Sequence, residues 1–361
     1  MDNITSTFAE LMDAYGINGE VASYRKITNG HINTTYAVVI GANEYIFQKI
    51  NSYVFKDPVV VMRNIKTVAN YIINNNIKSV CKIVRFLENK ENINYTILDN
   101  GDFWRLCKYE SGTVAVDTVT DSAILKNSGY AFGDFLNAIS GLCSDRLHIT
   151  IPDFHNTRKR MDDFFAVVDA NKGSERAEEV KAEIEQIRQY RDFCSMLTDM
   201  TDSGELPLRP VHNDTKYNNI LLDEKTFDPV CVIDLDTIMP GLVAHDFGDA
   251  IRFAANTAAE DEADLSKVSM DMECYKQFTS GFVGRAKHFL TEKEIETLAY
   301  GAPTITLELA SRFLADYING DKYFTIHYPN HNLVRAKCQL KLAQDMFGKL
   351  EEMNAYVLSC I

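Results

Sequence analysis

Apolar and polar residues follow two different patterns along the chain, and the change falls near residue 112. Before it, short apolar runs bounded by turn residues predict strands. After it, apolar residues recur at spacings of three and four, which predicts helices. The sequence therefore predicts an α+β fold with a small antiparallel sheet followed by a larger helical part. In the first part we expect helices at 1–18 and 59–75, and strands at 21–27, 34–40, 44–50, 83–88, 95–98 and 103–109.

A predicted hairpin interrupts the helical part. Residues 219–222 and 230–235 read as two strands, joined by the polar turn 223–229. Such a hairpin would bring the residues just before its first strand close to those at the end of its second. Around it we expect helices at 123–142, 157–170 and 176–198 and then from 247 to the end, including 308–317 and 333–349.

Composition limits the classes of function. Apolar residues make up 46% and charged residues 24%, as in ordinary soluble enzymes. A net charge of −14 argues against nucleic acid as a partner, because backbone phosphates would be repelled. We find no apolar run of about 20 residues and no signal-peptide pattern, and the eight cysteines form no CxxC pair. These features predict a cytoplasmic enzyme with reduced thiols and no membrane partner, and they leave the oligomeric state open.

The hairpin carries the candidate chemistry. Four residues stand at the spacings of a kinase catalytic loop, H-x-D-x-x-x-x-N: His212, Asp214, Lys216 and Asn219. Asp234 follows in an apolar run. Phosphoryl transfer needs a base for the attacking hydroxyl, together with carboxylate and amide oxygens for Mg²⁺. Asp214 would be the base, and Asn219 with Asp234 would hold the metal. The remaining candidates are Lys216 for the transferred phosphate and Asp236 as a second metal ligand or a nearby acceptor.

The motif has two other possible interpretations. A single HxD pair also occurs in ordinary loops and helix caps, but four matched positions followed by a strand carboxylate are much rarer by chance. Histidine, aspartate and asparagine also bind metals in hydrolases. A zinc site would need several histidines or cysteines at ligand spacings, whereas the neighbours here are lysine, threonine and tyrosine. Phosphoryl transfer is therefore the favoured interpretation.

The chain also resembles a known family. It is similar to the aminoglycoside-phosphotransferase-like kinases, and within them to the bacterial N-acetylhexosamine 1-kinases. The matching strings run nearly end to end. They are NGHINTTY at 29–36, YIFQKIN at 45–51, FWRLCKY at 103–109, IPDFHNTRKR at 151–160, HNDTKYNN at 212–219, IDLDTIMPGL at 233–242, HDFGDAIR at 245–252, RFLADYINGDKYF at 312–324 and HNLVRAKCQ at 331–339.

The resemblance implies a bilobal protein-kinase-like fold that uses ATP and Mg²⁺. Its N-lobe would span residues 1–110 and its C-lobe 111–361, with Tyr109 at the hinge beside the adenine. Gly30, Asn33 and Thr34 would lie in the phosphate loop. The chain departs from the protein-kinase pattern at Gln48, which takes the position of the strand lysine, and the expected helix 59–75 has no acidic residue to pair with a lysine. We expect Gln48 and the loop amides to meet the phosphates.

The resemblance also implies the acceptor. The γ-phosphate would pass to the anomeric hydroxyl of an N-acetylhexosamine, with Asp214 as base. Contacts to the sugar would come from His31, Phe253, Arg312 and Tyr323, although Arg312 would also suit a salt bridge with Glu308 four residues earlier. His212, Asp246 and Asp249 are expected to support the catalytic loop.

Three alternatives remain at this point. An aminoglycoside kinase would need a carboxylate-rich floor for its substrate. A choline- or homoserine-type kinase would combine the same chemistry with a different pocket. A non-catalytic binding protein would be expected to have lost one of Asp214, Asn219 or Asp234, and all three are present.

Overall fold

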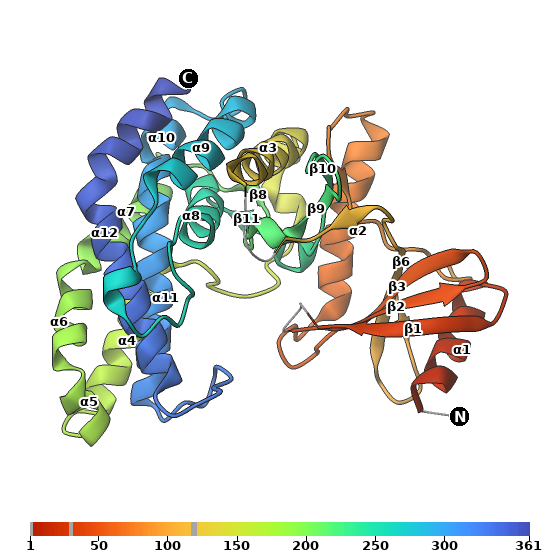
Figure 1. Cartoon of the computed structure of the whole chain (residues 1–361), viewed down its shortest axis with the longest axis horizontal. Coiled ribbons are helices and arrows are strands. Elements are labelled where there is room, and N and C mark those ends of the chain that lie inside the picture. Colours follow the sequence, from red (N-terminus) through yellow and green to blue (C-terminus); the bar gives the residue numbers. More distant parts are fainter. Residues whose placement is uncertain (1–2, 29–31, 117–120) are drawn as a thin grey trace.

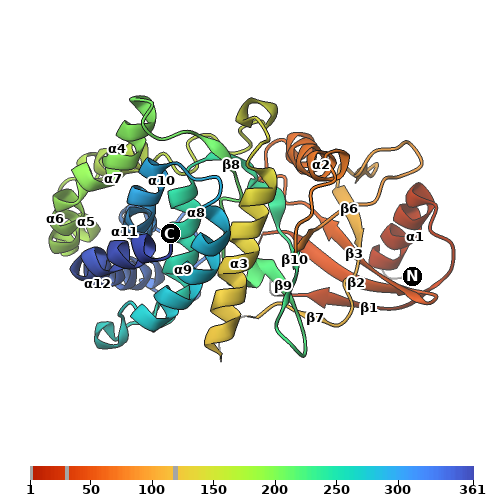
Figure 2. The same ribbon diagram turned by 90° about the horizontal axis from the view of Figure 1, so that it is seen from above.

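The computed structural model describes residues 3–28, 32–116 and 121–361. Its N-terminal part is an antiparallel sheet with strand order β1-β2-β3-β6-β5, and helix α1 packs on one face (Figures 1 and 2). Helix α2 follows β3 along the chain and contacts elements of the helical part. The elements are α1 (Asn3–Tyr15), β1 (Val21–Ile27), β2 (Thr34–Ile40), β3 (Asn43–Lys49), α2 (Pro58–Asn74), β5 (Thr96–Ile97) and β6 (Phe103–Lys108).

Strand alternation gives this sheet two different faces. Val38, Phe47 and Leu106 point to the side of α1 and pack with Phe8 and Leu11 in a buried cluster. The opposite face carries both apolar and polar side chains and borders a cavity. Two neighbours on adjacent strands, Gln48 of β3 and Arg105 of β6, lie on that face. One face of the sheet therefore packs against α1 in a hydrophobic core, and the other face lines the cavity.

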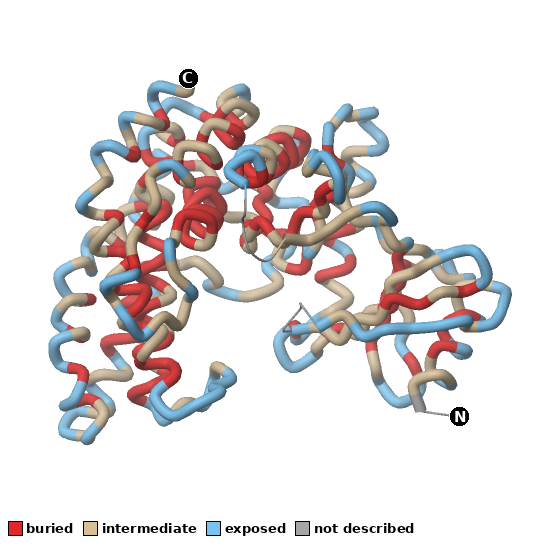
Figure 3. Tube along the Cα trace, viewed as in Figure 1, coloured by how far each residue is buried: buried red, intermediate tan, exposed pale blue. Residues whose placement is uncertain are grey.

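The C-terminal part is mainly helical, and its most buried segments lie where α3, α8 and α11 meet their neighbours (Figure 3). Close approach of two helices needs glycine at Gly301, because a Cβ there would lie 1.7 Å from the carbonyl oxygen of Ala244. This contact holds α8 tightly against α11. The helices are α3 (Ser122–Ile139), α4 (Thr157–Ala170), α5 (Glu175–Glu179), α6 (Lys181–Gln189), α7 (Arg191–Asp202), α8 (Val243–Ala254), α9 (Met272–Ala286), α10 (Glu292–Thr297), α11 (Gly301–Ile318) and α12 (His331–Ser359).

Short strands between the sheet and the helices carry the candidate chemistry. The expected hairpin is present as β9 (Ile220–Asp223) and β10 (Pro229–Val232), which pair antiparallel within a sheet of order β4-β10-β9-β7. Strand β8 (Arg209–Val211) pairs with β11 (Met239–Gly241) and leads into the catalytic loop. The remaining elements are β4 (Lys82–Ile83), β7 (Thr113–Val114) and the 3₁₀ turns η1 (Ser144–Arg146), η2 (Tyr217–Asn219), η3 (Leu235–Thr237), η4 (Leu265–Lys267) and η5 (Leu298–Tyr300).

The predicted fold class is confirmed, and two element predictions were wrong. The helix expected at 176–198 is broken into α5, α6 and α7, because the backbone leaves helical geometry at Val180 and Tyr190. The side chain of Val180 packs in a buried cluster. Tertiary packing at this residue therefore overrides the helical spacing of the sequence. The strand expected at 83–88 is only Lys82–Ile83, and it pairs in parallel with β10 of the catalytic hairpin.

Among the helices of residues 3–28, 32–116 and 121–361, none combines the length and apolar character that a bilayer crossing needs.

Candidate active site

The catalytic loop is fixed by a carboxylate on helix α8. The backbone N–H groups of His212 and Asn213 donate to the two carboxylate oxygens of Asp246, at 2.8 and 2.7 Å. The hydroxyl of Thr215 donates to the backbone carbonyl of Asp246. The support expected from Asp246 is thereby confirmed. Asp249, for which the same role was expected, instead accepts hydrogen bonds from Arg252.

His212 lies behind the loop as a neutral imidazole. Its Nδ1 accepts from the backbone N–H of Asp214 at 3.3 Å, so the ring proton is on Nε2, which donates to the carbonyl of Ile233 at 3.0 Å. Burial lowers the pKa of His212, which keeps the ring uncharged at neutral pH. The structural role expected for His212 is confirmed, and its two bonds connect the catalytic loop to the end of β10.

Asp214 lies between a cation and an amide. The ammonium of Lys216 is 3.1 Å from its Oδ1, and the side-chain nitrogen of Asn219 donates to its Oδ2 and its backbone carbonyl. Burial would raise the pKa of Asp214, but the charge of Lys216, with the hydrogen bonds from Lys216 and Asn219, outweighs this effect and holds it below its usual value. The carboxylate is therefore ionised at neutral pH and able to accept a proton. Because Asn219 uses its nitrogen for Asp214, its amide oxygen is left available as a metal ligand.

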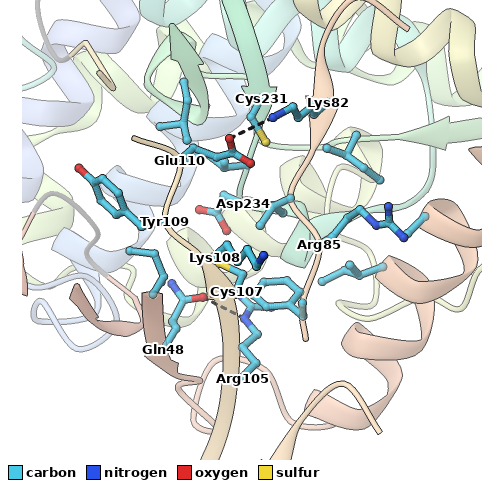
Figure 4. A pocket seen from close by; sticks show the side chains of 18 of the residues that line it. Gln48, Lys82, Arg85, Arg105, Cys107, Lys108, Tyr109, Glu110, Cys231 and Asp234 are labelled. Atoms are coloured by element: carbon cyan, nitrogen blue, oxygen red, sulfur yellow. Dashed lines mark hydrogen bonds and ion pairs between the residues drawn. The ribbon is translucent and has the colours of Figure 1, made fainter. Parts of the chain in front are cut away.

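Asp234 is the second carboxylate of the site and opens into the cavity (Figure 4). We expected it inside a strand, which was wrong: β10 ends at Val232, and Asp234 has left-handed backbone angles before η3. Its carboxylate has no hydrogen bond or ion pair with any other residue that the structure describes. Desolvation by the surrounding walls, with the charges of Asp236 and Asp214, raises its pKa to about 7. A carboxylate left unpaired beside other negative charges suits a divalent cation, and the oxygen of Asn219 suits the same hard ion.

Asp236 is placed differently from Asp234. Both of its carboxylate oxygens accept hydrogen bonds from the guanidinium of Arg105, at 2.5 and 3.0 Å, and one also accepts from Asn33 at 2.8 Å. Its side chain is 1% exposed. A metal ligand needs a free oxygen, so this geometry favours the acceptor role of Asp236 over the ligand role that was also expected.

A cavity of about 1150 Å³ lies between the N-terminal sheet and the catalytic hairpin. Gln48 and Tyr109 line it from the sheet and the expected hinge, and Asn219 and Asp234 line it from the hairpin. Figure 4 shows a basic set around it, with Lys82, Arg85, Arg105 and Lys108, although the chain as a whole is acidic. This is a space in which an anionic ligand would reach the catalytic loop.

The phosphate-loop residues are only partly brought to this cavity. Gly30, and likewise His31 of the sugar set, lie outside the described residues. The side chain of Asn33 donates to Asp236. Thr34 lines a separate cavity of about 320 Å³, whereas its neighbour Thr35 lines the large one and accepts a hydrogen bond from Gln48. Strand alternation therefore places Thr35, and not Thr34, beside the proposed phosphate position.

The expected sugar residues fall into two groups. Phe253 on α8 lies against Tyr217 of the catalytic loop, with ring centroids 4.8 Å apart. Arg312 and Tyr323 both lie against Phe324, with the Arg312 guanidinium 5.5 Å from its ring centre and the Tyr323 ring 4.8 Å away. Arg312 is also 3.7 Å from Glu308, the salt bridge considered as an alternative.

Sequence reasoning missed two residues of the site, one buried and one half-buried. Arg105 is 1% exposed and holds Asp236 and Gln48 together. His155 lies two residues before α4, and its Nδ1 is 3.1 Å from a carboxylate oxygen of Glu308, which also pairs with Arg312. The signal for Arg105 was a single arginine within the apolar strand FWRLCKY, where a charge is stable only with a partner. Nothing comparable in the sequence around His155 indicates Glu308 as its partner.

An ionised carboxylate held beside an amide and a lysine, with a second, unpaired carboxylate in the same cavity, is the arrangement that phosphoryl transfer of the kinase type requires. Residues 23–271 match the model of the phosphotransferase enzyme family, described as APH. Since this is more than half of the chain, the protein belongs to that family and is a phosphotransferase.

Solved structures with the same fold cover nearly the whole chain. A microcompartment-associated aminopropanol kinase aligns with a TM-score of 0.64 at 14% identity, over 97% of this chain and 98% of the other. An aminoglycoside phosphotransferase from Alicyclobacillus acidocaldarius aligns at 0.62 and 13%, over 96% of both chains. A spectinomycin phosphotransferase, solved with ADP and spectinomycin, aligns at 0.58 and 13%, over 96% and 98%. At these identities the likeness shows the fold alone.

Proposed function

We propose that this phosphotransferase is an ATP- and Mg²⁺-dependent N-acetylhexosamine 1-kinase, which transfers the γ-phosphate to the anomeric hydroxyl of N-acetylglucosamine or N-acetylgalactosamine. The nucleotide would occupy the large cavity. Ile27 and Ile46 line it from the sheet, and Leu221 and Ile233 line it from the hairpin, so a flat adenine ring would lie between two apolar layers. The polar end of the same cavity, with Gln48, Asn219 and Asp234, would receive the phosphates.

The catalytic step follows from the arrangement around Asp214. Its ionised carboxylate would take the proton of the acceptor hydroxyl while the oxygen forms a bond to the γ-phosphorus and the bond to the ADP oxygen breaks. Lys216, held 3.1 Å from Asp214, would neutralise charge on the transferred group. The negative charge of Asp214 raises the pKa of Lys216 and outweighs the opposing effect of burial, so the ammonium stays charged at neutral pH. Mg²⁺ held by Asn219 and Asp234 would supply charge neutralisation at the phosphates when bound.

The choice of a neutral acceptor rests on one observation: the acidic side chains near the proposed sugar residues Phe253 and Arg312 are paired with basic ones. Asp249 and Glu260 both accept from Arg252. Glu308 is 3.1 Å from His155 and 3.7 Å from Arg312. A polycationic aminoglycoside needs unpaired carboxylates to replace its water, whereas a neutral sugar needs donors, acceptors and an aromatic wall. Phe253 beside Tyr217 and the Arg312–Phe324–Tyr323 group would supply the latter set.

An acceptor screen tests the proposal. N-acetylglucosamine, N-acetylgalactosamine, glucosamine, kanamycin and choline would each be incubated with ATP and Mg²⁺, and the products read by phosphorus NMR. We expect a sugar 1-phosphate from one or both N-acetylhexosamines. Phosphorylation only at the 6-position, or turnover of kanamycin or choline with neither acetylated sugar used, would refute the proposed acceptor and leave the phosphotransferase assignment intact.

A substitution pair tests the acceptor site itself. Arg312→Ala should raise KM for the sugar by about tenfold or more, because a buried polar contact would be left unpaired, while KM for ATP changes less than twofold. Arg188→Ala is the matched control, since Arg188 also lies over an aromatic ring, Phe165, at 4.6 Å, but on the outer helix α6. Equal effects of the two substitutions would remove Arg312 from the sugar site.

A further inference from the structure

Arg105 is the most completely engaged charged residue of the site. Its Nε and Nη2 donate to the amide oxygen of Gln48 at 2.9 and 2.6 Å, and Nη1 and Nη2 donate to Asp236 at 2.5 and 3.0 Å. Nη1 also contacts the sulfur of Met62 at 3.6 Å, and the guanidinium lies 4.3 Å from the ring centre of Phe86. With all of its N–H groups directed at protein atoms, Arg105 acts through its neighbours.

The Arg105–Asp236 ion pair joins segments that are 131 residues apart in the chain. Arg105 belongs to β6 of the N-terminal sheet, and Asp236 belongs to η3, directly after the proposed metal ligand Asp234. Asn33 donates to the same carboxylate, and its own oxygen accepts from the backbone N–H of Asn51. A single buried carboxylate thereby connects the sheet, the start of β2 and the metal-binding turn.

Stability alone does not explain such a pair. Removing two charges from water costs several kcal/mol for each ion, and apolar residues of similar volume often replace a buried pair with no loss of stability. Both side chains are at most 2% exposed here. A function in the site is therefore the better physical reason for keeping them.

The position of Arg105 relative to Gln48 indicates that function. The two residues are direct partners in the β3–β6 register. Because Arg105 takes the amide oxygen of Gln48, the amide nitrogen must face the other way; one of its N–H groups donates to Thr35 at 2.9 Å. The second N–H has no partner among the residues that the structure describes, and Gln48 lines the cavity. In the opposite orientation the amide oxygen would face the cavity and repel phosphate oxygens.

We propose that Arg105 and Asp236 form a positioning pair that takes the place of the strand-lysine and helix-glutamate pair of protein kinases. Arg105 orients Gln48 so that it presents an N–H group to the nucleotide phosphates, and Asp236 holds the turn that carries Asp234 against the same sheet. Helix α2 has no acidic residue along Pro58–Asn74, so it does not supply the carboxylate of this pair. The inference rests on phosphoryl transfer and not on the identity of the acceptor.

Binding of Mg·ATP tests this inference without any acceptor. In calorimetric titrations with a non-hydrolysable ATP analogue and Mg²⁺, Arg105→Met and the isosteric Asp236→Asn should each weaken binding by about 10- to 100-fold, the range of one lost charge-assisted contact. The double variant should be little worse than either single one, because both remove the same pair. In turnover assays KM for the acceptor should change less than twofold. Guanidinium ion at low millimolar concentration should partly restore binding in Arg105→Ala.

Lys49→Met is the matched control. Lys49 follows Gln48 in β3 and pairs with Asp102 at 2.6 Å, but its side chain is 40% exposed and the pair lies outside the large cavity. We expect wild-type binding in this variant. If Arg105→Met does not fold, Asp236→Asn decides. The inference would be overturned if a folded variant of either residue bound Mg·ATP with wild-type affinity. It would also be overturned if KM rose equally for ATP and for the acceptor. Failure to phosphorylate a sugar would leave it standing.

Discussion

Replacement of Asp246 by alanine tests how the catalytic loop is held. In the folded protein its two carboxylate oxygens accept from the N–H groups of His212 and Asn213, and its side chain is fully buried. Alanine would leave both N–H groups without a partner and without access to water. Each such group costs about 1–3 kcal/mol, so the gross loss is roughly 2–6 kcal/mol.

The charge of Asp246 reduces this figure. Burial raises its pKa to about 7, opposed by the hydrogen bonds from His212 and Asn213, so the ionised carboxylate carries a cost of its own in the folded state. We therefore expect the lower part of the range, a loss of about 2–3 kcal/mol in the free energy of unfolding. Because the loop positions Asp214, kcat should also fall by about 10²-fold, with KM for ATP nearly unchanged.

Asp223→Ala provides the control in urea-unfolding and turnover assays. Asp223 also accepts two backbone N–H bonds, from Lys225 and Thr226, both at 2.9 Å, but at an accessible turn. Water replaces such an acceptor, so the loss there should stay near 0.5 kcal/mol with kcat unchanged. If Asp246→Ala is no less stable than Asp223→Ala and keeps its kcat, the loop is not held by this carboxylate and the reasoning fails.

Three further outcomes are expected. Asp214→Asn should lower kcat by about 10²–10⁴-fold with little change in ATP affinity, and wild-type turnover would exclude Asp214 as the base. Since the pKa of Asp234 is raised to about 7, protons compete with Mg²⁺ below that pH; calorimetry should show Mg·ATP affinity rising from pH 6 to 8 in the wild type and flat in Asp234→Ala. Burial lowers the pKa of His155, but Glu308 outweighs this and raises the pKa overall. The stability that the pair contributes is therefore full below about pH 6.5 and is lost as pH rises through the raised pKa. In urea unfolding, His155→Gln should not show this decrease in stability with rising pH.

The local parts of the fold could be predicted because their signals are local. Short apolar runs bounded by turn residues predicted β1, β2, β3 and β6, with limits within one residue of those observed, and predicted the catalytic hairpin. Apolar spacings of three and four predicted the helix at Thr157–Ala170. Where the prediction failed, distant contacts decided: Val180 breaks a helical period to enter a core, and Lys82–Ile83 pairs with a strand that lies about 150 residues further along the chain.

The sequence by itself determined the chemistry of the catalytic loop, because Asp214, Asn219 and Asp234 lie within one hairpin and their spacing brings them together. Only the tertiary structure decided what surrounds them. It placed Arg105 against Asp236 across 131 residues, turned Thr35 and not Thr34 toward the large cavity, and paired the acidic side chains of the acceptor side with arginine and histidine. The physical reason is that a buried charge takes whatever partner the packing brings within reach, and no local pattern records which distant residue that is.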